Sequence, residues 1–340
     1  MISGVPKSVA ARLLELGRRP IPVTRRQALA TLGVGVAFGG LGTLWHINRV
    51  YLRSSIALKL WLPTPFDHEP ELGRCRAAAD RIRPLFTRMG RPARGEWLEI
   101  FDEPGQTLNE YVRSVSSASR EISGAILVLP FGEFDARLAR IVADVVALTE
   151  LFYGRAVTLL PVEPVPLGPE DRRGKGPGEQ LFTTPLLEFL RRRVASDAPA
   201  LLGITPMDLT PPEPGWNFVF GQASLVDRVG VWSLYRLVTR DVPPEMQFRR
   251  VAQVALHELG HMFGLWHCAA YSCGMNGSNT MKESDETPLA FCPECDAKIW
   301  WRFRLDPAQR YARLAQFAAS RGLARDAELW VRCAQSLKRG

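Results

Sequence analysis

The stretch HELGHMFGLWH, residues 257–267, decides the fold class, because it holds three of the chain's five histidines within eleven positions. The residues around it have helical spacing. At about 100° per residue, five apolar side chains fall along one line: Phe248, Val251, Ala255, Leu259 and Met262. His257 and His261 point to the opposite side, one turn apart. We therefore predict a helix that buries one face and presents two imidazoles on the other.

The ends of this helix are also visible in the sequence. Pro243, Pro244 and Glu245 are typical of a helix start, because proline fits the first turn and an acid suits its positive end. Gly264 is expected to end the helix, since glycine readily adopts the left-handed conformation. His267 lies six residues beyond the second histidine, so only a bend in the chain can return it to the other two.

Three converging imidazoles match the ligand set of a catalytic zinc site, which keeps a fourth position open for water. His257, His261 and His267 are the predicted ligands, each at about 2.0–2.1 Å from the metal. Glu258 follows the first ligand and can reach the metal's water, so we predict it to be the general base. The alternative is a helix with two surface histidines, which the added glycine and third histidine disfavour.

Four of the six cysteines form two short-spaced pairs. Cys268 and Cys273 are spaced C-x4-C, and Cys292 and Cys295 are spaced C-x2-C. Such pairs are typical of a structural zinc site with four thiolate ligands, with Zn–S distances of about 2.3 Å. The rival interpretation is two disulfides, which an exported protein would permit. We expect the other two cysteines, at positions 75 and 333, to be buried packing residues outside either arrangement.

The string HELGHMFGLWHCAAYSCGMNGSN, followed by FCPEC, resembles the archaemetzincin family of zinc metallopeptidases. Its first part is H-E-x-x-H-x-x-G-x-x-H, the metzincin zinc-binding pattern. The resemblance implies that Met275 is the methionine of the Met-turn beneath the zinc. It also implies an α+β metzincin-like peptidase domain, in which a mixed sheet is covered by a backing helix and the active-site helix.

The resemblance implies hydrolysis of peptide bonds by a zinc-activated water, with Glu258 as general base and then general acid. The expected cofactors are two Zn²⁺ per chain, one catalytic and one structural. Two other classes of function remain open: a catalytically inactive two-zinc binding module and a membrane-anchored assembly factor.

Patterns outside the histidine segment agree with an α+β fold. Residues 125–130, AILVLP, form an apolar run that predicts a buried strand. Residues 133–152 have helical spacing, and residues 156–162 predict the next strand. This strand–helix–strand order places a helix over a sheet. Residues 161–180 are rich in proline, glycine and charge, which predicts a surface loop without regular structure. Residues 307–337 predict two amphipathic helices hinged at positions 321–322.

The net positive charge of the chain comes from its first 60 residues. Residues 1–60 hold nine of the 43 Lys and Arg but only one of the 35 Asp and Glu, so the remaining residues carry 34 of each sign. A nucleic-acid-binding domain carries its basic excess on the folded part. A neutral body therefore argues against nucleic acid as a partner. The resemblance to archaemetzincins implies a peptide or protein substrate instead.

Residues 28–45, ALATLGVGVAFGGLGTLW, form the one long uncharged apolar run, and the arginine pair of TRRQAL stands directly before it. This arrangement resembles a twin-arginine signal. We predict a membrane anchor or export signal that places the catalytic domain outside the cytoplasm. The alternatives are a buried helix and a cytoplasmic protein. The expected domains are a leader (1–60), a zinc metallopeptidase domain (61–300) and a helical C-terminal tail (301–340).

Overall fold

The computed structural model describes residues 69–115, 124–213, 215 and 217–338. The predicted leader, with its apolar segment 28–45, lies outside these residues. Within the described ranges, none of the helices combines the length and apolar character needed to cross a bilayer. Apart from residues 213 and 215, the described residues belong to one unit of the chain.

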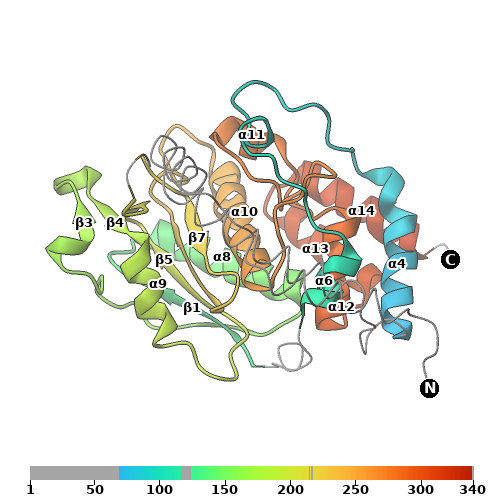
Figure 1. Ribbon diagram of the computed structural model, residues 1–340, viewed down its shortest axis with the longest axis horizontal. Helices are drawn as coiled ribbons and strands as arrows, with labels where there is room; N and C mark the ends of the chain where they lie inside the picture. Colours follow the sequence, from blue (N-terminus) through green and yellow to red (C-terminus); the bar gives the residue numbers. More distant parts are fainter. Residues whose placement is uncertain (1–68, 116–123, 214, 216, 339–340) are drawn as a thin grey trace, which may run out of the picture. The chain divides into compact units, whose positions relative to one another are not determined.

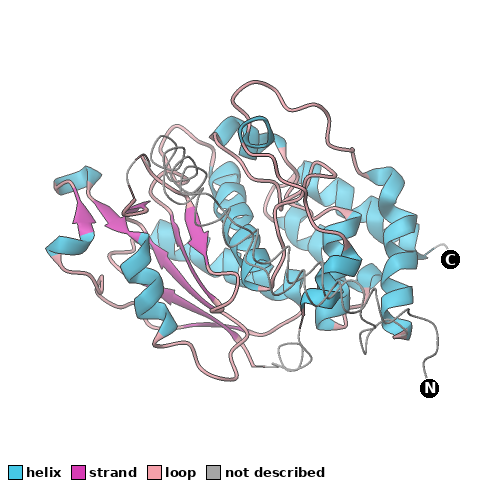
Figure 2. Ribbon diagram, in the orientation of Figure 1, coloured by secondary structure: helices cyan, strands magenta, loops and turns pink. Residues whose placement is uncertain are grey.

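A five-stranded sheet runs through this unit in the order β2-β1-β5-β8-β7 (Figures 1 and 2). Neighbouring strands are parallel except β7, which is the last in that order and pairs antiparallel with β8. The strands are β1 (Ile126–Pro130), β2 (Val157–Leu159), β5 (Leu201–Thr205), β7 (Gly221–Ala223) and β8 (Val229–Ser233). Helix α8 (Ala136–Tyr153) connects β1 to β2, which confirms the predicted strand–helix–strand unit.

Both faces of the sheet are buried because side chains alternate between two cores. On β1, Val128 belongs to the core that contains α8 and the active-site helix α10 (Pro244–Met262). Leu129, the next residue, belongs to a smaller core that contains Leu186 and Leu190 of α9 (Thr183–Arg191). Parallel strands covered on both faces need apolar residues throughout. This explains why residues 125–130 show an unbroken apolar run.

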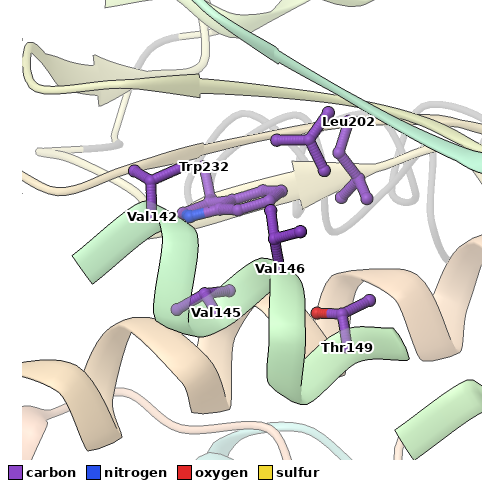
Figure 3. Close-up of a pocket in the computed structure, with 7 residues that line it drawn as sticks. Val142, Val145, Val146, Thr149, Leu202 and Trp232 are labelled. Carbon is purple, nitrogen blue, oxygen red and sulfur yellow. The ribbon is translucent and has the colours of Figure 1, made fainter. Parts of the chain in front are cut away.

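The packing of α8 on the sheet is drawn in Figure 3. Val142, Val145 and Thr149 of α8 lie against Leu202 of β5 and Trp232 of β8. The gap between them is too tight for a water molecule. The indole Nε1 of Trp232 has no hydrogen-bond partner among the described residues. Helix and sheet are therefore in close, mainly apolar contact around Trp232.

The structure corrects the prediction for residues 161–180, which are not entirely irregular. β3 (Arg172–Arg173) pairs antiparallel with β4 (Gln180–Phe182), which in turn pairs parallel with β6 (Asp208–Thr210). The chain turns between β3 and β4 at Gly174 and Gly176, both of which have positive φ. The glycines that indicated a loop instead close a short hairpin.

A group of helices lies on the side of α10 away from the five-stranded sheet (Figure 1). They are α4 (Pro70–Ile82), α5 (Trp97–Ile100), α6 (Leu108–Ser114), α11 (Met281–Glu286), α12 (Pro293–Phe303), α13 (Pro307–Ser320) and α14 (Ala324–Lys338). α13 and α14 are the two helices predicted for the tail, and Gly322 between them has a φ of 75°. Their apolar faces join the main core through Tyr311 and Trp330, both 0% exposed.

A buried ionic network ties α13 to the rest of the unit. The Asp296 carboxylate on α12 accepts hydrogen bonds from the Arg310 guanidinium at 3.1 and 3.2 Å. It also accepts one from the Tyr311 hydroxyl at 2.5 Å. Arg310 Nε donates to the Phe152 carbonyl oxygen of α8 at 2.6 Å. The side chains of Asp296 and Arg310 are 0% and 3% exposed, so each charge depends on the other for neutralisation.

Replacing Arg310 with methionine leaves the Asp296 carboxylate buried without its counter-ion. We expect Arg310→Met to lower the free energy of unfolding by about 3–5 kcal/mol. The matched control is Arg313→Met on the exposed side of the same helix, which should change it by less than about 0.5 kcal/mol. Urea unfolding followed by circular dichroism measures both. Equal stability of the two variants would contradict a stabilising role for the network.

Candidate metal centres

Helix α10 forms as predicted and ends where predicted. The five apolar residues proposed for its buried face are all 5% exposed or less. Gly264 has a φ of +88°, and the amides of Gly264 and Leu265 donate to the carbonyl oxygens of His261 and Gly260. These bonds close the helix and reverse the chain. The reversal brings His267 back to the face that carries His257 and His261.

The three imidazoles meet at one point. The Nε2 atoms of His257 and His261 are 3.0 Å apart, and the ring centroid of His267 lies 5.2 and 4.8 Å from those of His257 and His261. One ligand atom from each residue lies within 4.8 Å of the others. Two nitrogens bound to one tetrahedral zinc would be about 3.3 Å apart. The spacing therefore fits a single zinc ion.

Each imidazole is held through its other ring nitrogen. His257 Nδ1 is 3.0 Å from the Gly274 carbonyl oxygen, and His261 Nδ1 is 2.8 Å from that of Leu265. His267 Nδ1 is 2.9 Å from the Glu103 carboxylate. A carbonyl or carboxylate oxygen only accepts, so each Nδ1 must carry the proton. Every Nε2 lone pair is then left for a metal, which is the usual arrangement around ligating histidines.

The electrostatics favour neutral imidazoles. Burial, with a smaller contribution from the neighbouring His267 side chain, lowers the pKa of His257 to about 3. Burial also lowers the pKa of His261 well below its ordinary value, and the other two imidazoles add to the effect. A neutral imidazole is the form that binds metal. The ligand set is therefore ready for a cation at neutral pH without the loss of protons from these two residues.

Glu258 lies on the helix between the first two histidines and is 8% exposed. Burial raises the pKa of Glu258 to about 8. A dication in the neighbouring site would stabilise the carboxylate and move the pKa back down. Its side chain lies against Gly221 of strand β7, where an added Cβ would come within 2.9 Å of Glu258 Oε1. Any larger residue at this position would force the Glu258 side chain to shift.

The four paired cysteines also converge. Their sulfur atoms lie within 4.8 Å of one another and are buried, and those of Cys268 and Cys292 are 3.7 Å apart. Two sulfurs on a tetrahedral zinc with Zn–S bonds of about 2.3 Å would be about 3.8 Å apart. No disulfide joins any cysteine in the described ranges, which include all six. The four thiols form one site rather than two bridges.

The thiol chemistry suits a bound cation. Burial raises the pKa of Cys273 and Cys292, whereas a hydrogen bond from Cys273 lowers that of Cys268. Four buried thiolates are stable together only beside a cation, which deprotonates them as it binds. Cys273 Sγ already accepts hydrogen bonds from the backbone amides of Met275 and Cys292. These donors would stabilise a metal-bound thiolate.

Met275 is 0% exposed and packs beneath α10. A Cβ added at Gly260 would lie 2.4 Å from Met275 Sδ, so the side chain fills the space left by that glycine. Its carbonyl oxygen accepts a hydrogen bond of 2.8 Å from the Cys268 amide. Met275 therefore supports the helix turn that carries the first two histidines.

The sequence analysis missed three residues at this site. Glu103 orients His267, Gly221 makes room for Glu258, and the Trp97 ring on α5 stacks edge-on at 5.0 Å from the His267 ring. Glu103 and Trp97 lie more than 160 positions before the residue they contact. No local spacing pattern links residues so far apart.

Part of the chain is similar in sequence to known proteins. The sequence model of peptidase family M54 matches residues 178–300. Archaemetzincin of Methanopyrus kandleri is 40% identical over 127 residues, which cover 37% of this chain and 69% of that protein. The chain belongs to the archaemetzincin family. The crystal structure of the Methanopyrus kandleri protein aligns at 31% identity and a TM-score of 0.46, covering 55% of this chain and 98% of that one.

Other archaemetzincins match over shorter shares of their length. Human archaemetzincin-2 is 34% identical over 200 residues, which cover 49% of this chain and 54% of that protein. Archaemetzincin of Archaeoglobus fulgidus is 43% identical over 98 residues, covering 29% of this chain and 58% of that protein. The chain thus spans about half the length of the archaemetzincin-2 relatives. Glu103 and Trp97 lie before the segment matched by the family model.

Removing the Glu103 carboxylate should loosen His267. We expect Glu103→Ala to weaken zinc binding at the histidine site about 10–100-fold, because outer partners fix ligand orientation. Glu103→Gln should weaken zinc binding less than Glu103→Ala does, since the amide oxygen of glutamine can still accept a hydrogen bond from His267 Nδ1. Asp102→Ala, a change at the exposed neighbour, serves as the control. Competition with a chromophoric chelator measures the affinities, and unchanged binding by Glu103→Ala would refute the assigned role.

Proposed function

We propose that this chain is a zinc-dependent peptidase, as expected for a member of the archaemetzincin family. One observation carries the proposal: one ligand nitrogen from each of three imidazoles lies within 4.8 Å of the others, and the Glu258 carboxylate is on the helix that carries His257 and His261. Three protein ligands leave a fourth position for water, which distinguishes catalytic from structural zinc sites. The four-cysteine cluster supplies a closed ligand set, so we assign a structural zinc to it.

Zinc in the histidine site would lower the pKa of a water ligand and polarise a substrate carbonyl. Glu258 is the residue placed to accept a proton from the water as its oxygen attacks the peptide carbonyl carbon. The same carboxyl group then donates a proton to the nitrogen as the C–N bond breaks. His257, His261 and His267 would hold the metal, since the Nδ1 of each is already hydrogen-bonded to an oxygen acceptor that fixes its ring.

Strand β7 offers a place for an extended peptide. It is the last strand of the sheet and pairs on one side with β8. Strand edges recognise extended peptides through main-chain hydrogen bonds. Gly221 in this strand lies directly against Glu258, so a peptide along β7 would pass the proposed general base. This neighbourhood favours a peptidase over a binding module with a closed metal site.

We propose from the sequence alone that residues 1–60 attach the protein to a membrane or direct its export. The support is the uncharged run at 28–45 behind an arginine pair, with the basic excess of the chain on this leader. The catalytic domain would then act outside the cytoplasm. This proposal is independent of the zinc chemistry.

Glu258→Gln should reduce peptide turnover about 10²–10⁴-fold, because the amide cannot accept the water's proton. Zinc content should stay near two per chain, since Glu258 is not a ligand. Glu245→Gln, at the exposed first turn of the same helix, is the control and should keep full activity. Cleavage of a peptide library, with and without a chelator, provides the assay. Undiminished turnover by Glu258→Gln would rule out the general base.

Deleting residues 1–60 tests the leader. The full chain should appear in the membrane or extracytoplasmic fraction, whereas the shortened chain should remain soluble in the cytoplasm and keep its zinc and peptidase activity. Cell fractionation and metal analysis provide the readouts. Loss of zinc from the shortened chain would favour a folding role for the leader. An unchanged distribution would contradict the localisation.

A further inference from the structure

The loop between α10 and α11 contributes to both candidate metal centres. It supplies the third histidine at position 267 and then the first two cysteines, Cys268 and Cys273. The other two cysteines, Cys292 and Cys295, lie at the start of α12. Metal–sulfur bonds in this cluster would therefore tie the loop to α12. The same loop contacts the histidine site in two ways, through His267 and through a hydrogen bond to His257.

The first connection is covalent. His267 and Cys268 are consecutive residues, yet each belongs to a different ligand set. The Cys268 amide donates to the Met275 carbonyl oxygen at 2.8 Å. Its own carbonyl oxygen accepts from Asn276 Nδ2 at 2.7 Å. The backbone on the carboxyl side of His267 is thus fixed by the same loop that the cysteines would clamp.

The second connection is a hydrogen bond. His257 Nδ1 donates to the carbonyl oxygen of Gly274, which lies between Cys273 and Met275. The Gly274 amide donates to Ala290 O at 2.9 Å, and a Cβ at Gly274 would lie 3.0 Å from both Leu289 O and Phe291 Cδ1. The oxygen that orients the first imidazole is therefore positioned by close packing next to a cysteine ligand.

The Asn276 side chain cross-links the backbone of the loop. Its Oδ1 accepts from the Cys273 amide at 2.8 Å, while its Nδ2 donates to the carbonyl oxygens of Cys268 and Tyr271. The residue is 7% exposed. These bonds link the two cysteines of the loop to each other. A displacement of either cysteine would therefore move both His267 and the acceptor of His257.

We propose that the four-cysteine site controls the histidine site: metal bound by the cysteines holds His257 and His267 in zinc-binding position. The two sites are then thermodynamically coupled. The inference rests on the proposed zinc chemistry of both clusters, but it does not depend on peptide hydrolysis. It predicts that loss of metal from the cysteines weakens zinc binding by the histidines, and that the effect is reciprocal.

Cys295→Ser in the full-length protein tests the coupling. Cys295 lies on α12, outside the loop, and is 1% exposed, so the change removes a cysteine ligand without altering the loop sequence. Cys333→Ser is the matched control, because it makes the same change at a buried cysteine outside both clusters. Cobalt reports the sites separately, since only thiolate ligands give sulfur-to-metal charge-transfer absorption.

We expect Cys295→Ser to weaken metal binding at the histidine site about 10–100-fold relative to wild type, the size of effect seen when ligand orientation is lost. The metal affinity of the histidine site in Cys333→Ser should stay within about twofold of the wild-type value. His261→Ala, which removes a ligand of the histidine site, should in turn weaken metal binding at the cysteine site, because coupling acts in both directions. Histidine-site affinity within twofold of wild type in folded Cys295→Ser would overturn the proposal.

A second measurement covers the case in which Cys295→Ser does not fold. Wild-type protein loaded with two zinc ions is titrated with an organomercurial that binds thiols, and released zinc is followed with a chromophoric chelator. Release of both ions as the four clustered cysteines react supports coupling, provided that Cys333→Ser gives the same curve. Release of one ion, with the second retained, overturns it. Neither readout uses turnover, so an inactive but coupled protein would refute only the proposed peptidase function.

Discussion

The left-handed bend at Gly264 is the constraint on which the candidate active site depends. A continuous helix would carry His267 away from the other two histidines, and an L-residue side chain at a φ of +88° would be strained. With the bend, one ligand nitrogen from each of the three histidines lies within 4.8 Å of the others. The outer hydrogen bonds from Nδ1 to Gly274, Leu265 and Glu103 then fix each ring. The orientation of the three imidazoles thus depends on the backbone bend at Gly264.

Burial of polar groups organises the rest of the unit. The helices on the far side of α10 bury the Asp296–Arg310 pair. α10 and α14 share a second buried pair, Arg249 with Asp326, in which Arg249 also donates to the Thr287 carbonyl oxygen in the segment before α12. Each pair neutralises charges that would be costly to bury alone. These networks connect the C-terminal helices to the framework that carries both metal centres, so α13 and α14 are part of that framework.

Much of the fold could be predicted because its signals are local. Apolar runs predicted β1, and helical periodicity predicted α8, α10 and the two tail helices. The β3–β4 hairpin was missed because its glycines indicate a turn but not whether the flanking residues pair. β5, the second parallel neighbour of β1, lies far from it along the chain, and sequence periodicity does not specify strand order.

The sequence by itself determined the candidate ligands: the spacing of His257, His261 and His267, the bend between them, and the two cysteine pairs. These features lie within 39 consecutive residues, so helix and turn geometry suffices to relate most of them. Only the tertiary structure decided what surrounds the ligands. Glu103 reaches His267 across 164 positions, and Gly221 meets Glu258 where a strand packs on a helix. Such contacts depend on how distant elements pack, and no local pattern encodes that packing.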